Sequence, residues 1–314
     1  MPSFLSQSHL SILSTCPRKY RYIYVDGLAA PVSLLQHRSM EWGAQFHQLM
    51  QQRSLGLPVD RLIDAYPEVN ACLKALEQVD PAIFGSQGGD AMRPGFFRQS
   101  EHPRSYPWPC AMPSHDDRND RWVFRVVYDL LLLQPGKAQI LDWKTYPQPR
   151  NLAFLRDHWQ TRLYLFVLVE TTEYRPEDVS MIYWFVRHQS ENGTLNPQSC
   201  QFQYDRFQHE ETRQALQEHI KNLTQWQKDY PQTGHSITSS AVSNSIPSDS
   251  AISDSAVSNS PQEPFPKIPE SSTACIRCNF NQRCDRGNLA LNDQETMNWE
   301  KLLAIDSIPQ TNLN

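Results

Sequence analysis

The sequence predicts an α/β or α+β fold in which helices flank a central sheet. Apolar side chains recur at helical spacing across residues 6–79. After residue 94 come short β-branched or aromatic runs, separated by turn residues such as Pro135 and Gly136. A long helical pattern at 151–172 then precedes a further strand pattern. The expected order is therefore helices, a mainly antiparallel sheet, a helix and more sheet.

Composition narrows the class of protein. The 314 residues carry a formal net charge of −5, so any surface for nucleic acid has to be a local basic patch. No apolar run approaches the roughly 18 residues that span a bilayer, and MPSFLSQSHL lacks the pattern of a secretory signal. We therefore expect a cytoplasmic protein that does not associate with membranes. In that setting the seven cysteines favour metal binding or burial over a disulfide framework.

The N-terminal part is expected to be helical. Ser6 or Ser8 would cap a first helix, and Cys16 and Pro17 would break it. Serine 39 would cap a longer helix, and further helical pattern follows at 59–79.

The sheet part begins near residue 94. Asp129 closes the apolar run 126–128, a loop follows, and a second run covers 140–144. The proline-rich and polar stretch 100–120 is read as a loop. The later elements are a helix from Asn151 to about Thr172, a strand at 179–186, a hairpin turn at 190–193, a strand near 200–204 and a helix at 206–229.

Residues 233–273 differ in kind from the rest of the chain. SAVSNS occurs at 240–245 and again at 255–260, and the segment has few large apolar residues to bury. We expect a disordered serine-rich linker here. It would divide the chain into a core at 1–232, with a helical part at 1–93 and a sheet-bearing part at 94–232, and a cysteine-bearing segment and tail at 274–314.

Asp142 and Lys144 stand two residues apart in the apolar run 140–144. Alternate strand residues share a face, so a carboxylate and an ammonium would project together from a strand with apolar neighbours. Their desolvation costs free energy unless they pair or bind an ion. On spacing alone, a structural ion pair and an active site explain them equally well.

Four cysteines are candidates for one metal site: Cys16, Cys275, Cys278 and Cys284. The last three form the pattern C-x2-C-x5-C, and C-x2-C places two thiolates on one turn. The first also follows a helix and precedes a proline, which makes it the best candidate for a fourth ligand. Spacing leaves zinc and an iron–sulfur cluster open. Of the other cysteines, Cys72 and Cys200 lie in patterns of buried residues, and Cys110 has no evident role.

His47 follows Gly43 by one turn on the predicted third helix. A lone helical histidine is more often a packed or surface residue than a ligand. With Asp129 and Asp142 it would supply one imidazole and two carboxylates, which suit Mg²⁺ or Mn²⁺. Lys144 could then orient or deprotonate an attacking water and offset charge on a phosphate.

Gln160 and Tyr164 form an i, i+4 pair on the long predicted helix. Arg156 lies a turn earlier on the same face. Taken alone, these residues indicate a solvated helix face.

Together, these motifs resemble the RecB-like branch of the PD-(D/E)XK nuclease superfamily. The resemblance is closest to its iron–sulfur members, the CRISPR-associated RecB-like exonucleases and the AddB-type helicase-nuclease subunits. The matching pieces come in family order over residues 5–170 and 274–285: SQSHLSILSTCPRKYRYIYV, GAQFH, YD, LDWKT, QTRLY and CIRCNFNQRC. The resemblance implies a restriction-endonuclease-like fold, with a mixed central sheet, flanking helices, and N- and C-terminal segments joined by a cluster.

The resemblance also implies roles for single residues. The catalytic set would be Asp129, Asp142, Lys144, Gln160 and Tyr164. His47 would join the two aspartates in holding Mg²⁺ or Mn²⁺, while Gln160 and Tyr164 would contact DNA or brace the site. The four clustered cysteines would hold a [4Fe–4S] cluster, with zinc as the alternative. Another acidic residue, Glu101, is the candidate for an upstream acid of the family.

The expected function is a metal-dependent deoxyribonuclease, an exonuclease that acts on single-stranded DNA or DNA ends in repair, recombination or foreign-DNA processing. Besides Gln160 and Tyr164, basic residues near the cysteines would contact DNA: Arg18, Lys19, Arg21, Arg277, Arg283 and Arg286. No GxxxxGK[ST] motif occurs, so any unwinding would come from a helicase or other DNA-processing partner. Two alternatives remain, a non-catalytic DNA-binding or assembly subunit with the same fold, and a zinc or redox protein built around the cysteines.

Overall fold

The computed structural model describes residues 3–28, 34–84, 95–108, 122–146, 152–230, 263–276 and 278–286. Its sheet is mixed: β1 pairs with β3, and β4 with β5, in parallel, and the other pairs are antiparallel. The order is β1-β3-β4-β5-β6, and β2 lies on the other edge of β3. The strands are β1 (Ser3–Leu5), β2 (Phe97–Pro107), β3 (Trp122–Gln134), β4 (Lys137–Lys144), β5 (Val179–Phe185) and β6 (Gln198–Gln203).

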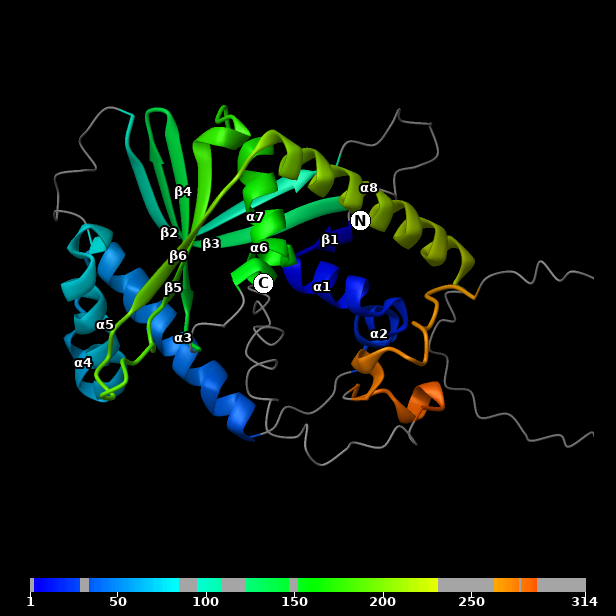
Figure 1. The fold of residues 1–314 in the computed structure, drawn as a ribbon, viewed down its shortest axis with the longest axis horizontal. Helices are drawn as coiled ribbons and strands as arrows, with labels where there is room; N and C mark the ends of the chain where they lie inside the picture. The colour runs from blue at the N-terminus through cyan, green and yellow to red at the C-terminus, as the bar shows by residue number, and fades with distance from the viewer. Residues whose placement is uncertain are drawn as a thin grey trace, which may run out of the picture.

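Helices cover both faces of this sheet (Figure 1). One face carries α3 (Leu34–Ser54), α4 (Asp60–Ala65) and α5 (Pro67–Val79). The other carries α1 (Gln7–Thr15), α6 (Leu152–Asp157), α7 (Trp159–Glu170) and α8 (Arg206–Asp229). The short helices are α2 (Pro17–Tyr20), a π-helix at Arg21–Val25, and 3₁₀ turns at Pro81–Phe84, Pro176–Asp178, Thr273–Cys275 and Gln282–Cys284. The predicted α/β class, a mixed sheet flanked by helices, is confirmed.

Side-chain alternation along the strands divides the interior into two cores. Ile140 of β4 packs in the core that contains Leu163 of α7, whereas its neighbour Leu141 packs with Phe46 of α3. Both cores are fully buried from solvent at these positions. Residues 142 and 144 continue the first series, which directs them toward α7.

The helix ends match the sequence at some points and differ at others. Ser6 is the N-cap of α1, and Cys16 ends it, as expected. Serine 39 lies inside α3, which begins at Leu34, because a serine costs little in a helix interior and does not have to mark its start. The single helix expected at 151–172 is two helices, since His158 has the extended ψ of 144° that breaks the chain before α7. Asn151 lies outside the described residues.

The strands also correct three expectations. Residues 100–107 belong to β2 and are not a loop. The strand contains prolines 103 and 107, which an edge strand such as β2 tolerates. The remainder of that stretch, with Cys110, lies mostly outside the described residues. Asp129 does not end a strand but lies within β3. The N-terminal part is not wholly helical, since it contributes β1.

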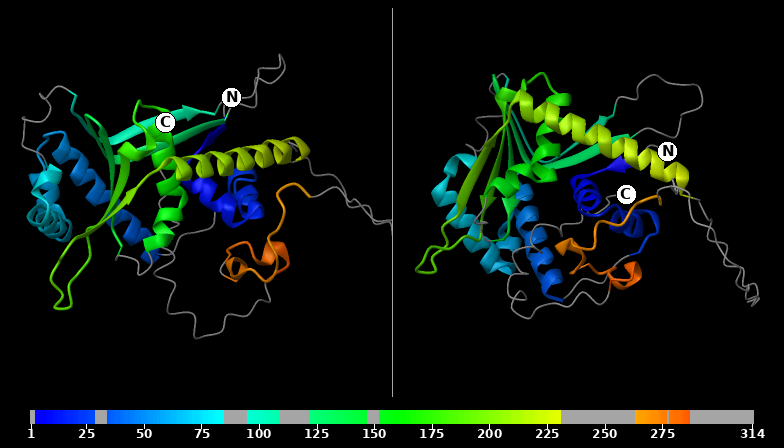
Figure 2. Two further views of the ribbon diagram at one scale, coloured as in Figure 1. Left: turned by 45° about the horizontal axis from the view of Figure 1, so that its top comes forward. Right: turned by 45° about the vertical axis from the view of Figure 1, so that its right-hand side comes forward.

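The C-terminal segment packs beside the N-terminal helices (Figure 2). Phe265 is fully buried, and its ring lies 6.2 Å from that of Tyr20 and 5.3 Å from that of Trp226. Residues 263–273 therefore belong to the packed body, and the expected linker end at 273 is too late. Most of the serine-rich stretch, 231–262, lies outside the described residues.

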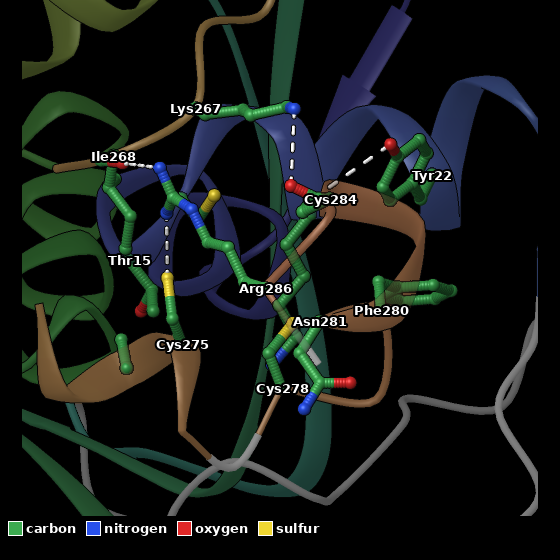
Figure 3. Close-up of a pocket in the computed structure, with 13 residues that line it drawn as sticks. Thr15, Tyr22, Lys267, Ile268, Cys275, Cys278, Phe280, Asn281, Cys284 and Arg286 are labelled. Atoms are coloured by element: carbon green, nitrogen blue, oxygen red, sulfur yellow. Dashed lines mark hydrogen bonds between the residues drawn. The ribbon is translucent and has the colours of Figure 1, made fainter. Parts of the chain in front are cut away.

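A small cavity lies between this segment and the N-terminal helices (Figure 3), and all four clustered cysteines border it: Cys16, Cys275, Cys278 and Cys284. Each is a free thiol. Arg286 Nη1 donates a hydrogen bond to Cys275 Sγ at 2.9 Å. The fold thus brings together cysteines from both ends of the chain. Cys72 is buried on α5, as expected, whereas Cys200 is only half-buried on β6.

Candidate active site

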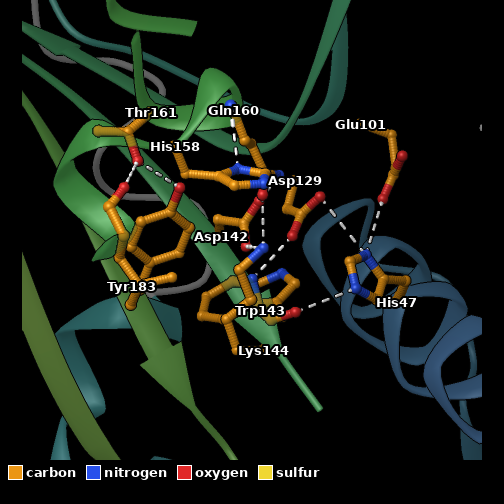
Figure 4. Close-up of polar contacts among 11 residues, drawn as sticks. His47, Glu101, Asp129, Asp142, Trp143, Lys144, His158, Gln160, Thr161 and Tyr183 are labelled. Carbon is orange, nitrogen blue, oxygen red and sulfur yellow. Dashed lines mark hydrogen bonds and ion pairs between the residues drawn. The ribbon is translucent and has the colours of Figure 1, made fainter. Parts of the chain in front are cut away.

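Asp142 and Lys144 lie at the end of β4, and a side chain of α7, that of Gln160, contacts both of them (Figure 4). Lys144 Nζ lies 2.8 Å from Asp142 Oδ2. The Gln160 amide closes the set, since its Oε1 accepts from Lys144 Nζ at 2.6 Å and its Nε2 donates to Asp142 Oδ1 at 2.6 Å. Asp142 and Lys144 are only 2% and 6% exposed. The shared strand face predicted from spacing is confirmed, and the pair is buried, which separates it from an exposed surface ion pair.

Strands β3 and β4 separate at this site. Their pairing ends at Leu130 opposite Leu141, so Asp129 and Asp142 stand opposite each other just beyond the last pair. There the Asp129 side chain takes over as acceptor, because Trp143 N–H donates to its Oδ2 at 2.7 Å. The carboxylate therefore occupies the place of a ladder carbonyl.

The alternation of side chains between the two faces of β3 is interrupted at Asp129. Tyr128 packs in the core beneath α7, but Leu130, two residues on, packs in the core beneath α3. Across the ladder, Glu101 lies between the paired residues Ser100 and His102 and has a positive φ of 48°. A non-glycine residue with positive φ in a strand carries backbone strain, which persists only where the surroundings enforce it.

Glu101 and Asp129 both face His47 of α3. His47 Nδ1 lies 3.4 Å from Asp129 Oδ1 and 3.6 Å from Glu101 Oε1. One ligand atom from each of the three residues lies within 4.8 Å of the others. His47 Nε2 is 3.3 Å from the carbonyl oxygen of Trp143, which ties the helix to the end of β4.

The electrostatics of this group favour a bound cation. Burial opposes a charged His47, but Asp129 and Glu101 outweigh it and hold the pKa of His47 well above its usual value. Burial raises the pKa of Asp129 to about 6; His47 offsets part of the rise, and Asp142 adds to it. In the metal-free protein the His47 proton thus offsets crowded negative charge, and a divalent ion could replace it.

The close group of candidate ligands differs in one member from the set expected from the sequence. Within the described residues, the close set contains Glu101 in place of Asp142, whose oxygens face Gln160 and Lys144. Asp129 and His47 are common to both sets. From the sequence, Glu101 is only a candidate for an upstream acid of the family, and its backbone conformation, with a φ of 48°, follows from no local pattern.

Tyr164 and His158 complete the α7 side of the site. Tyr164 is 2% exposed, and burial together with the charges of Asp142 and Asp129 raises the pKa of its phenol well above the usual value. His158 is the N-cap of α7, where its Nδ1 accepts from Gln160 N–H at 3.2 Å. His158 could not be assigned from the sequence, because histidine is not a preferred capping residue.

Several basic residues expected to contact DNA are used within the fold. Arg18 is 5% exposed, pairs with Glu263 at 2.6 Å and donates to the Phe265 carbonyl at 2.8 Å, so it is not a surface residue. Arg21 lies 3.2 Å from Asp26, and its guanidinium lies over the Tyr230 ring. Arg286 is held by Cys275 and by the Ile268 carbonyl. Lys19 borders the cysteine cavity, Arg283 is exposed, and Arg277 lies outside the described residues.

An Asp-x-Lys strand end beside an imidazole and two carboxylates is the arrangement of a metal-dependent phosphodiesterase. The family model described as PD-(D/E)XK nuclease superfamily matches residues 4–285, and the chain belongs to that superfamily. Membership implies nuclease activity, with a divalent metal ion as cofactor and DNA as substrate.

Other comparisons are more distant. The crystal structure of SSO0001 is similar over 70% of this chain and 77% of that chain, with 10% sequence identity and a TM-score of 0.33. No curated protein matches the chain. Among the helices that the structure describes, none has the length and apolar character required to cross a membrane.

Proposed function

We propose that the protein is a deoxyribonuclease of the RecB-like branch, an exonuclease that acts on single-stranded DNA or DNA ends. The observation that carries this proposal is the buried set of Lys144, Asp142 and Gln160 beside the His47 group. Any unwinding would be done by a helicase or other DNA-processing partner, because the sequence has no phosphate-binding GxxxxGK[ST] loop.

His47, Glu101 and Asp129 would hold Mg²⁺ or Mn²⁺, and Asp142, whose charge acts on Asp129, is a further candidate ligand. Imidazole and carboxylate donors suit these hard cations. Asp142 Oδ2 is buried and has no partner in hydrogen-bond geometry, although Lys144 lies 2.8 Å away, so it keeps capacity for an ion. The bound ion would lower the pKa of a water molecule and offset charge on the phosphate.

Lys144 would act as a fixed cation. Burial alone would lower the pKa of Lys144, but Asp142 reverses this effect, so its pKa is raised and it stays protonated. A protonated lysine does not accept a proton. It would therefore orient the attacking water and stabilise negative charge on the phosphate, with Gln160 fixing its position.

We further propose that the four cysteines around the cavity hold a [4Fe–4S] cluster. A tetrahedral zinc site with Zn–S bonds of about 2.3 Å needs sulfur atoms about 3.8 Å apart. Among the residues that the structure describes, no three of these sulfur atoms lie within 4.8 Å of one another. The observation that supports a shared site is that cysteines from both ends of the chain border one cavity.

The nuclease proposal is tested with end-labelled single- and double-stranded DNA, in Mg²⁺, Mn²⁺ or EDTA. The wild type should release nucleotides only with metal, and Lys144→Ala should not. Lys137→Ala is the matched control, because Lys137 is exposed at the opposite end of the same strand. Equal activity of Lys144→Ala and wild type would refute the mechanism, and an inactive wild type would favour the non-catalytic DNA-binding subunit.

The cluster proposal is tested by anaerobic purification, iron, sulfide and zinc analysis, and the visible spectrum. Cys278→Ser should lower metal content, melting temperature and activity together, because the cluster would join the two chain ends without taking part in hydrolysis. Cys200→Ser, on β6 away from the cavity, should change none of them. Zinc without iron or sulfide would refute the cluster, and so would loss of metal with unchanged melting.

A further inference from the structure

An exposed aromatic ring lies at the edge of the proposed active site. Phe154 of α6 is 46% exposed. Its ring centroid lies 5.8 Å from that of His158, at an interplanar angle of 43°. His158 is itself half-buried at the start of α7. The two rings thus form a partly solvent-exposed aromatic surface.

His158 links this surface to the catalytic residues. Its Nδ1 accepts from Gln160 N–H, which fixes the ring orientation and leaves the proton on Nε2. The side chain of Gln160 in turn contacts both Lys144 and Asp142. Burial, and then the charge of Lys144, lower the pKa of His158 to about 4, so the ring is neutral at ordinary pH. Figure 4 shows this ring beside Asp142.

We propose that Phe154 and His158 form a stacking surface for the unpaired nucleobase next to the scissile phosphate. This inference rests on the proposed nuclease function and assigns base recognition to two named residues. Aromatic rings beside a nucleic-acid backbone site bind bases irrespective of sequence, because every base has a π-face. Bases inside a duplex are already stacked and paired, so this surface would favour single-stranded substrate over a blunt duplex.

The test measures binding of labelled single-stranded oligonucleotides by fluorescence anisotropy, with Ca²⁺ replacing Mg²⁺ to keep the DNA uncut. Each oligonucleotide carries one abasic position, which is moved along the strand. Phe154→Leu removes the ring but keeps apolar volume. His158→Asn removes the other ring but keeps an acceptor that caps α7. Phe4→Leu is the control, because Phe4 is 45% exposed on β1.

Phe154→Leu and His158→Asn should each weaken binding of the intact strand by about 10-fold or more. An abasic site at one particular position of the strand should weaken wild-type binding by a similar factor. The affinity of Phe154→Leu should be the same with and without an abasic site at that position. Blunt duplex binding, and the Phe4→Leu variant, should be unaffected. Wild-type binding by Phe154→Leu, or additive effects of the variant and the abasic site, would overturn the stacking surface alone. A wild type that neither binds nor cuts DNA would overturn the nuclease proposal as well.

Discussion

Gln160 accepts a 2.6 Å hydrogen bond from Lys144, although one residue lies on α7 and the other on β4. The orientation of the Gln160 amide is fixed, because its nitrogen donates to Asp142. The helix therefore determines where the ammonium of the strand lies. This contact makes the position of α7 part of the catalytic geometry.

Replacement of Gln160 by alanine should lower kcat by about 100-fold, because the Lys144 ammonium would no longer be held in one place. KM should change much less, since the side chain is directed at the lysine and the aspartate. Steady-state cleavage of a single-stranded oligonucleotide measures both constants. Gln139→Ala, on the same strand as Lys144, is the control. An unchanged kcat in Gln160→Ala would contradict this role.

Replacement of Glu101 by glutamine should weaken Mn²⁺ binding by about 10-fold or more, because it removes one of the charges that face His47. Isothermal titration of the DNA-free protein with Mn²⁺ measures this affinity. Glu191→Gln, in an exposed turn, should bind like the wild type. If Glu101→Gln also binds normally and Asp142→Asn does not, the ligand set is the one expected from the sequence.

Metal affinity should fall as the pH is lowered, first through the raised pKa of His47 and then more steeply below about 6. The pKa of Asp129 is about 6, so below that pH a proton competes with the ion for its carboxylate. The pKa of His47 is raised, so the imidazole has to release its proton when the ion binds. Mn²⁺ titrations in buffers of different ionisation enthalpy count the released protons. Affinity that is independent of pH, with no proton release, would exclude these residues as ligands.

Replacement of Phe265 by alanine should lower the free energy of unfolding by about 3–5 kcal/mol. The ring is fully buried between Tyr20 and Trp226, and its loss would leave a cavity between the two chain ends. Urea unfolding followed by tryptophan fluorescence measures the change. Phe4→Ala, at a half-exposed ring, should cost much less. Equal midpoints for the two variants would mean that the C-terminal segment adds no stability.

The parts of the site that sequence predicts are those set by local geometry. Asp142 and Lys144 share a strand face because alternation in β4 is regular, and Gln160 and Tyr164 are both on the α7 side because helical spacing is regular. What the sequence does not reveal depends on irregular backbone. Asp129 marks a shift of alternation inside a continuous strand, which in the sequence looks like a strand end.

Other differences come from contacts between distant segments. The prolines of β2 are compatible with a strand because β2 lies at an edge of the sheet. The amino-acid composition of the segment does not show that it lies at an edge. Arg18 has the sequence context of a surface residue, but Glu263 and Phe265 return from the far end of the chain and bury it. Contacts between residues this far apart in the sequence form only when the chain has folded, so local sequence patterns do not predict them.

The positive φ of Glu101 lowers the stability of the fold at a residue whose carboxylate is a candidate metal ligand. A glycine would adopt the same φ of 48° without the steric cost that a glutamate carries, a relief on the order of 1 kcal/mol. It would also leave His47 facing one carboxylate in place of two. The strained backbone of Glu101 thus accompanies a second carboxylate beside His47.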